Sequence, residues 1–164
     1  MNLGPLQKAM GKGLDGMLKL VEDTLHQDAY SKTDICKILE LSNEEDLFKL
    51  CHISDHVRNY GSFELYKRAM HVFGEAKRVY DFKGICDDNQ TSMNGTNSVK
   101  DELPLAMLGQ LMFASHESCD NMYDCSHPQL NTLVNLSKKH GALGARYGGF
   151  KVIFHPILYN IQYI

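Results

Sequence analysis

The sequence has no tryptophan, only four prolines, and no apolar run near the roughly 18 residues that a membrane-spanning helix needs. The residues after Met1 also lack the basic and long apolar stretches of a secretory signal, so we expect a cytoplasmic protein. A net charge of only −3 gives no strong field to attract a polyanion. The composition therefore predicts neither a nucleic-acid partner nor a membrane partner. At 164 residues, one domain is expected.

The five cysteines are odd in number, widely scattered and never spaced as Cys-x-x-Cys, which excludes a disulfide framework. Cys119, Cys125 and His127 lie close in sequence, but their spacing matches no structural zinc site. His116 and Cys119 could pair as base and nucleophile, yet nothing nearby supplies an orienting carboxylate or an oxyanion site. We interpret the cysteines as reduced, mostly packed thiols, and a small thiol or metal enzyme is a remote alternative.

Apolar residues recur at three- and four-residue spacing in three stretches, as in amphipathic helices. The first stretch predicts a helix that is firm from Leu14 onward, because three glycines weaken its start. Two long helices are predicted, one over Ser62–Ile85 and one that begins at Pro104. The residues of the three stripes are Leu14, Met17, Leu18, Val21 and Leu25; Leu65, Ala69, Val72, Ala76 and Val79; and Leu105, Leu108, Met112, Ser115, Cys119 and Met122.

Capping residues mark the shorter helices. Ser31 is predicted to cap one helix, and Ser42 with Glu45 has the spacing of a capping box for the next. Ser126 with Gln129 predicts a third box, followed by a helix whose apolar side chains face inward and which stops before a glycine. Those inward-facing residues are Leu130, Leu133 and Val134, and the glycine is Gly141.

Polar stretches separate these elements. The span 87–102 is rich in Asp, Asn, Ser, Thr and Gly, so we expect a mobile surface loop. On the long helix before it, charged residues of both signs alternate along one side and predict a solvated face. These residues are Glu64, Lys67, Arg68, Glu75, Lys77 and Arg78. Near the C-terminus, Phe150–Phe154 is strand-like, and a lone strand could not satisfy its own edges.

A glycine-rich run, Gly141–Arg146 followed by Tyr147-Gly148-Gly149, is the strongest candidate for a binding site. Loops that cradle phosphate need residues that tolerate positive φ and let backbone N–H groups approach an anion. The candidate cofactor-binding residues are Gly144, Arg146, Gly148 and Gly149. No residue is predicted to be catalytic or to bind a metal.

Four sequence motifs, taken in their order along the chain, indicate a family resemblance. They are the helix Arg68–Val79, then Leu-Gly-Gln-Leu-Met-Phe-Ala-Ser-His-Glu-Ser-Cys at 108–119, then Tyr123–Val134, then Gly-Ala-Leu-Gly-Ala-Arg at 141–146. In this order they resemble the C-terminal part of galactokinases and N-acetylgalactosamine kinases, which belong to the GHMP kinase superfamily. Met17, Cys36 and Cys125 tilt the likeness slightly toward the N-acetylgalactosamine kinase branch.

The resemblance implies a mainly α fold, the helical part of an α+β C-terminal domain, with at most one or two residual β-strands after Gly149. Residues 1–146 would form this helical portion, and residues 147–164 a divergent tail that is not native to the family. Arg146-Tyr147-Gly148 can be encoded as AGG-TAT-GGN, which contains a splice-donor sequence. We therefore interpret the tail as translated intron.

The resemblance also implies ancestry in ATP- and magnesium-dependent phosphorylation of galactose or N-acetylgalactosamine. The family's glycine loop continues with Leu-Thr-Gly-Ala-Gly, which this sequence lacks after Arg146, and Tyr147 and Phe150 replace its Trp and Cys. We expect the chain to lack the N-terminal catalytic half and to be inactive by itself, binding neither ATP nor magnesium well. The alternative is a non-catalytic helical protein-interaction module derived from such a kinase.

Overall fold

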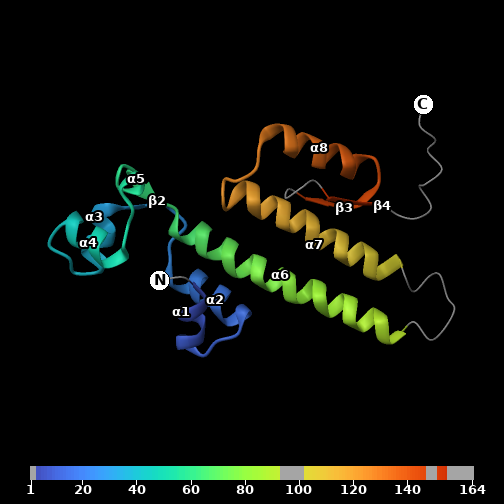
Figure 1. Cartoon of the computed structure of the whole chain (residues 1–164), viewed down its shortest axis with the longest axis horizontal. Coiled ribbons are helices and arrows are strands. Elements are labelled where there is room, and N and C mark those ends of the chain that lie inside the picture. Colours follow the sequence, from blue (N-terminus) through green and yellow to red (C-terminus); the bar gives the residue numbers. More distant parts are fainter. Residues whose placement is uncertain (1–2, 93–101, 147–150, 155–164) are drawn as a thin grey trace. The chain divides into compact units, whose positions relative to one another are not determined.

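The computed structural model describes residues 3–92, 102–146 and 151–154 (Figure 1). The fold is mainly α, as predicted, with short strands in two antiparallel pairs. Its elements are α1 (Leu3–Met10), α2 (Leu14–Thr24), β1 (Tyr30–Ser31), α3 (Lys32–Ile38), α4 (Glu44–Cys51), α5 (Asp55–Arg58), β2 (Ser62–Phe63), α6 (Leu65–Ser92), α7 (Glu102–Asn121), α8 (Pro128–Lys139), β3 (Ala142–Arg146) and β4 (Lys151–Phe154).

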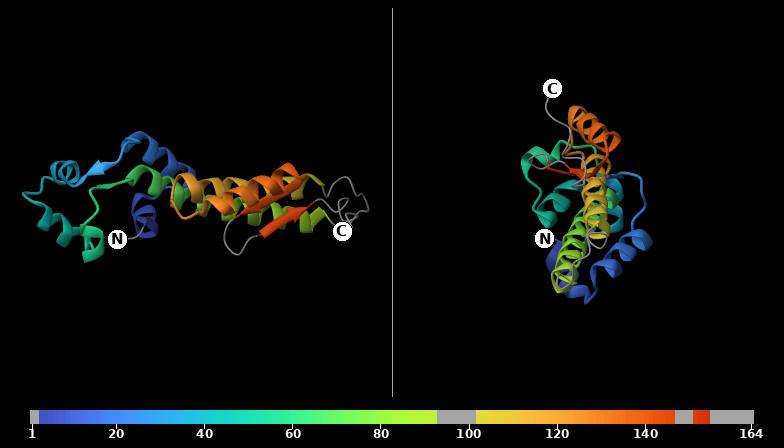
Figure 2. Two further views of the ribbon diagram at one scale, coloured as in Figure 1. Left: turned by 90° about the horizontal axis from the view of Figure 1, so that it is seen from above. Right: turned by 90° about the vertical axis from the view of Figure 1, so that its right-hand side faces the viewer.

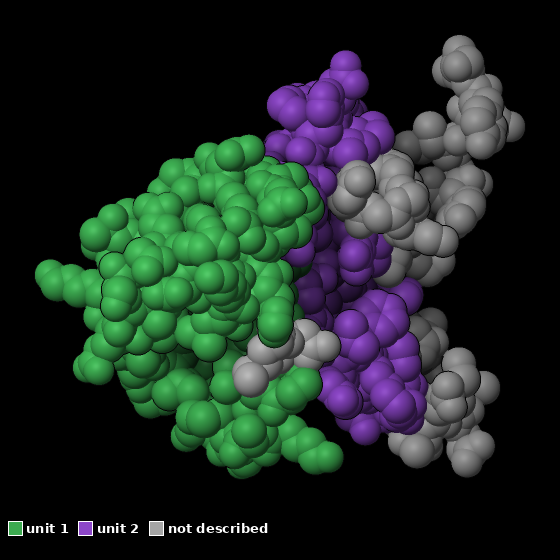
Figure 3. All heavy atoms as spheres, turned by 60° about the vertical axis from the view of Figure 1, so that its left-hand side comes forward, with its two compact units in different colours: residues 1–73 green, residues 74–164 purple. Residues whose placement is uncertain are grey.

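The chain divides into two compact units, Met1–Phe73 and Gly74–Ile164, which are coloured separately in Figure 3. The boundary falls inside α6, so that helix contributes residues to both units. None of the helices in the described ranges is long and apolar enough to cross a membrane.

The first unit is built on the predicted stripe of α2. Met17 is 1% exposed and, with Val21, packs on Phe73 of α6. Helix α2 begins at Leu14 as predicted, and α1 precedes it as a helix that the apolar pattern did not indicate. Gly11 separates the two helices with a φ of +61°, a conformation in which glycine avoids the steric penalty of a side chain.

Capping in this unit is partly as predicted. The Ser31 side chain accepts a hydrogen bond from the Asp34 backbone, and the Asp34 carboxylate accepts one from the Ser31 backbone, which completes a capping box. The predicted box of Ser42 and Glu45 is wrong, because Asn43 caps α4 by accepting from the backbone N–H of Asp46 at 3.0 Å. Asn and Ser are similarly good caps, so spacing alone could not choose between neighbouring positions.

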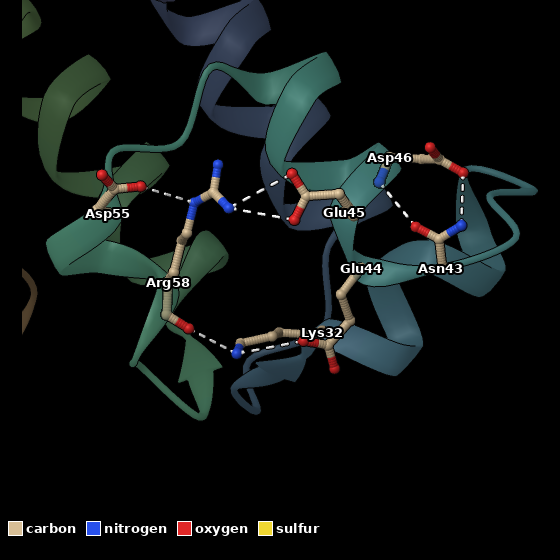
Figure 4. A network of polar contacts seen from close by, with 7 residues as sticks. All are labelled: Lys32, Asn43, Glu44, Glu45, Asp46, Asp55 and Arg58. Carbon is tan, nitrogen blue, oxygen red and sulfur yellow. Dashed lines mark hydrogen bonds and ion pairs between the residues drawn. The ribbon is translucent and has the colours of Figure 1, made fainter.

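Lys32, Arg58 and their partners form a polar network in the same unit (Figure 4). Lys32 donates to the carbonyl oxygen of Arg58 at 2.6 Å and pairs with Glu44, whereas Arg58 pairs with Glu45 and Asp55. The two cations also lie over the ring of buried Phe48, with Lys32 Nζ 5.4 Å and Arg58 Cζ 4.9 Å from its centroid. Cation–π attraction and ion pairs therefore join α3, α4 and α5.

The long helix α6 differs from the prediction at both ends. Ser62 and Phe63 do not begin it, because they form β2 and pair with β1. The helix continues to Ser92, so residues 87–92 of the predicted loop are helical. Ion pairs at four-residue spacing, Lys77 with Asp81 and Lys83 with Asp87, support this polar stretch. Residues 93–101 of the predicted loop lie outside the described residues.

The second unit combines α7, α8 and the pair β3–β4 with the later part of α6, and the strand pair packs on α7 and α8 (Figure 2). The predicted stripe of α7 is confirmed, with Met112, Ser115 and Cys119 buried. Of the three α8 residues predicted to face inward, Val134 is buried and Leu130 half-buried, but Leu133 is 41% exposed, so the prediction is wrong for Leu133.

The cap of α8 lies one residue later than the predicted box places it. His127, not Ser126, caps α8, since its Nδ1 accepts from the backbone N–H of Gln129 at 3.3 Å. The Ser126 hydroxyl is hydrogen-bonded to the Asn131 side chain instead. Gly141 follows α8 with a φ of +83°, as expected for a glycine that ends a helix.

Candidate functional site

The predicted glycine loop is a β-strand in its first part. Residues Ala142–Arg146 form β3 and pair antiparallel with β4, with Arg146 opposite Lys151 and an irregularity between Ala142 and Gly144. The backbone groups on one edge of β3 are therefore paired with β4. The strand-like segment after Gly149 forms β4, and it is not a lone strand, because one of its edges pairs with β3.

Gly144 is a glycine for a packing reason. It is buried, and a Cβ built on it would overlap the backbone of Gly109 on α7. A Cβ on Gly109 would likewise overlap the carbonyl oxygen of Leu143. The two glycines let a helix and a strand approach backbone to backbone, and Gly144 does not have the positive φ typical of a phosphate loop. The packing against Gly109 accounts for a glycine at position 144 without a phosphate, and the assignment of Gly144 to a binding loop stays a prediction.

The other candidate residues have different outcomes. Arg146 ends β3 and is partly exposed, and its charge acts on the thiol of Cys119. Gly148 and Gly149 lie outside the described residues, so their assignment to a binding loop stays a prediction.

A half-buried carboxylate near Cys119, that of Glu75, is not indicated by the sequence pattern. Glu75 accepts a hydrogen bond from the Ser115 hydroxyl at 2.8 Å and one from Arg78 Nε at 2.7 Å. Arg78 Nη2 also lies 2.6 Å from the same carboxylate. The side chains of Glu75 and Arg78 are only 24% and 22% exposed, so they do not belong to the solvated face predicted for α6. Ser115, a polar residue on the apolar stripe of α7, was the signal that a partner was needed.

Cys119 sits in the last turn of α7 with its thiol buried. Burial raises the pKa of Cys119 from its ordinary value of 9.0 to about 11, helped by a hydrogen bond with Cys125 and by the negative charge of Glu75. The positive charge of Arg146 lowers the pKa of Cys119, but this effect is smaller than the effects that raise it. The thiol is therefore protonated near neutral pH. Since the thiolate is the nucleophile, this environment disfavours the thiol enzyme considered above.

A polar groove of about 280 Å³ lies between α7 and α8. Within it, the Asn131 amide donates to the Asp120 carboxylate at 2.8 Å, and Lys138 Nζ lies 5.2 Å from the centre of the Phe113 ring. Its remaining lining residues are His116, Glu117, Asn121, Val134 and Asn135. In the described part of the chain, no group of three His, Cys, Asp or Glu side chains is placed to hold a metal ion. The groove offers hydrogen bonds and charges of both signs.

No protein-family model matches the chain. The chain is similar to galactokinases, with 37% identity over 149 residues to that of Dictyostelium discoideum and 30% over 138 residues to those of Candida albicans and Saccharomyces cerevisiae. Each likeness covers 83% of this chain but only 24–28% of the relative, so the chain spans about a quarter of their length. The similarity to these galactokinases therefore extends over most of this chain.

Proposed function

We propose that the chain is a segment of a sugar 1-kinase of the GHMP superfamily and supplies the helical part of its C-terminal domain. The observation that carries this proposal is the likeness to galactokinases over 83% of the chain. The mainly α fold is consistent with it. In this proposal residues 1–146 are the helical portion and residues 147–164 the divergent tail, and the protein acts in the cytoplasm.

The whole kinase would transfer a phosphoryl group from ATP, with magnesium, to galactose or N-acetylgalactosamine. The relatives support galactose, and the choice of N-acetylgalactosamine rests on the three residues named above. Phosphoryl transfer needs groups that hold the phosphates and the metal and a group that positions the sugar hydroxyl. The pairing of β3 with β4 and the contact of Gly144 with Gly109 support the proposal that this chain alone does not supply the phosphate-binding groups.

We therefore propose that the chain does not catalyse phosphorylation by itself. The test is to incubate the purified chain with Mg-ATP and either sugar, alone and after co-expression with the unmatched part of the Dictyostelium discoideum galactokinase. The chain alone should give no sugar-dependent ADP, and the co-expressed pair should give some. Sugar-dependent turnover by the chain alone would refute its inactivity, and failure of every combination would leave no support for the missing-half proposal.

A second candidate is an interaction module that now binds a protein partner. Large apolar side chains are exposed on the second unit, including Val79 and Tyr80 at 66% and 69% and Leu103 at 68%. Nearby, α6 and α7 flank a largely apolar groove of about 580 Å³ lined by Tyr80, Ile85, Met107 and Leu111 together with Asp81, Gly84, Asp88 and Gln110. A module should be monodisperse in light scattering, whereas an incomplete kinase domain should aggregate or bind a dye for exposed apolar surface.

The origin of residues 147–164 is a separate question. We propose that they are translated intron, on the coding argument at Arg146. The pairing of β4 with β3 is a contact that such a tail would have to make by chance. Sequencing the transcript tests the proposal directly. A spliced message that encodes the same tail would refute it.

A further inference from the structure

Two of the five cysteines lie together where α7 ends. The backbone N–H of Cys125 donates to the carbonyl oxygen of Cys119 at 3.0 Å, and the Cys125 thiol donates to the same oxygen at 3.5 Å. The two thiols also interact with each other. All five cysteines are free thiols in the structure.

The geometry meets the main requirement for a disulfide. Bridged cysteines have Cα atoms about 4.4–6.8 Å apart, and a direct backbone hydrogen bond between two residues holds their Cα atoms close to that range. The chain between them turns back at Asp124, whose φ of +51° lies in the left-handed region. The Cα separation therefore requires no large backbone movement for a disulfide to form.

We propose that Cys119 and Cys125 are a modification site, at which a peroxide or a small-molecule disulfide such as oxidised glutathione converts the two thiols into an intramolecular disulfide. The inference is independent of the proposed sugar-kinase ancestry. It concerns the chemistry of this pair only.

The two cysteines have different parts in the reaction. Cys125 is half-buried and meets the oxidant first, because Cys119 is 7% exposed and its pKa is raised to about 11. The Cys125 sulfur attacks one peroxide oxygen and the O–O bond breaks, which gives a sulfenic acid and water. The Cys119 sulfur then loses its proton, bonds to the Cys125 sulfur and displaces a second water. Two thiols and one hydrogen peroxide thus become one disulfide and two waters, the thiols losing two electrons and the peroxide gaining them. With oxidised glutathione, the Cys125 sulfur displaces one glutathione thiol to form a mixed disulfide, and the Cys119 sulfur then displaces the second, so that the glutathione gains the two electrons.

The cross-link would fasten the last turn of α7 to the segment that leads into α8. That segment is already held by hydrogen bonds, since Ser126 contacts Asn131 and Asn131 contacts Asp120. A disulfide at this place therefore stabilises an arrangement that the reduced protein has. The folded state should favour the disulfide relative to the unfolded chain.

The test is to equilibrate the full chain with glutathione buffers of fixed ratio, in buffer and in concentrated urea, and to quantify the Cys119–Cys125 peptide by mass spectrometry after acid quenching and alkylation. We expect the equilibrium constant for this disulfide to be at least about tenfold larger in buffer than in urea. An equal or smaller constant in buffer would overturn the proposal. So would a majority of pairings with Cys36, Cys51 or Cys86 in buffer.

Single variants separate this pair from general thiol oxidation. Cys125→Ser should abolish the disulfide, and Cys51→Ser, which changes an exposed thiol, should leave its equilibrium constant unchanged. Cys119→Ser changes a buried residue and can destabilise the fold. The comparison of the unmodified chain in buffer and urea does not depend on that variant. Loss of the disulfide in Cys51→Ser would also contradict the assignment.

Discussion

The two units achieve close packing by opposite means. In the first, the long side chains of Lys32 and Arg58 come from neighbouring helices and lie over the ring of the buried Phe48. In the second, α7 and β3 touch through Gly109 and Gly144, where both side chains are missing. Large side chains can adjust to a substitution by changing rotamer, whereas two backbones in contact cannot. The second contact should therefore be the more sensitive of the two to a small change.

The largest effect is expected for Gly109→Ala. Its new Cβ would overlap the carbonyl oxygen of Leu143, so the helix and strand must separate, at a cost of about 3 kcal/mol in the free energy of unfolding. Hydrogen exchange followed by mass spectrometry should show lost protection in α7 and β3. The control is Gly84→Ala on α6, where nothing lies within 4 Å of the new Cβ. It should be neutral or stabilise by up to about 1 kcal/mol, because alanine favours a helix. Equal protection in both variants would contradict the close approach.

Met17→Ala tests the core of the first unit in the same experiment. Met17 is 1% exposed and packs with Val21 and Phe73, so truncation should leave a cavity and cost about 2–3 kcal/mol. Protection should fall in α2 and in the first half of α6. Met10→Ala, at a position that is 43% exposed, is the matched control and should change stability by less than about 0.5 kcal/mol. A similar loss in both variants would argue against the assigned core.

Alkaline pH should weaken the second unit through Cys119. Its pKa is raised from 9.0 to about 11 by burial, so the unfolded chain loses the thiol proton at a lower pH than the folded chain does. The free energy of unfolding should therefore be unaffected by ionisation of Cys119 below pH 9. It should fall by about 2 kcal/mol in total as the pH rises toward 11. The measurement is urea unfolding between pH 8 and about 11, compared with Cys119→Ala to remove the titration of lysines and tyrosines. Identical pH profiles for the two proteins would refute the shift.

The smallest effect concerns the cap of α4. Asn43→Ala removes the side-chain acceptor for the N–H of Asp46 and should cost about 1 kcal/mol. Ser42→Ala should cost almost nothing, since Asn43 is the residue that caps the helix. Thermal unfolding of the two variants is sufficient to rank them. A larger loss for Ser42→Ala would restore the capping box predicted from spacing.

Local features of the molecule could be predicted because neighbouring residues produce them. The stripe of α2, the cap at Ser31 and the stop at Gly141 each depend on residues within about two turns of one another. The errors at Ser42 and Ser126 have a local cause too. In each, the adjacent residue also has a side chain that can accept a backbone hydrogen bond, and spacing alone does not rank the two.

The sequence by itself determined the helical character of the chain and its similarity to galactokinases. Periodic apolar residues and a fixed order of motifs can be recognised without knowledge of tertiary contacts. Only the tertiary structure decided the contact of Gly144 with Gly109 and that of Glu75 with Ser115. Gly109 and Gly144 are 35 positions apart, and Glu75 and Ser115 are 40 apart, so nothing in the local pattern joins them. A glycine that permits close backbone packing and a glycine that permits phosphate binding are identical in the sequence. They are distinguished only by the group that lies next to the glycine in the folded protein.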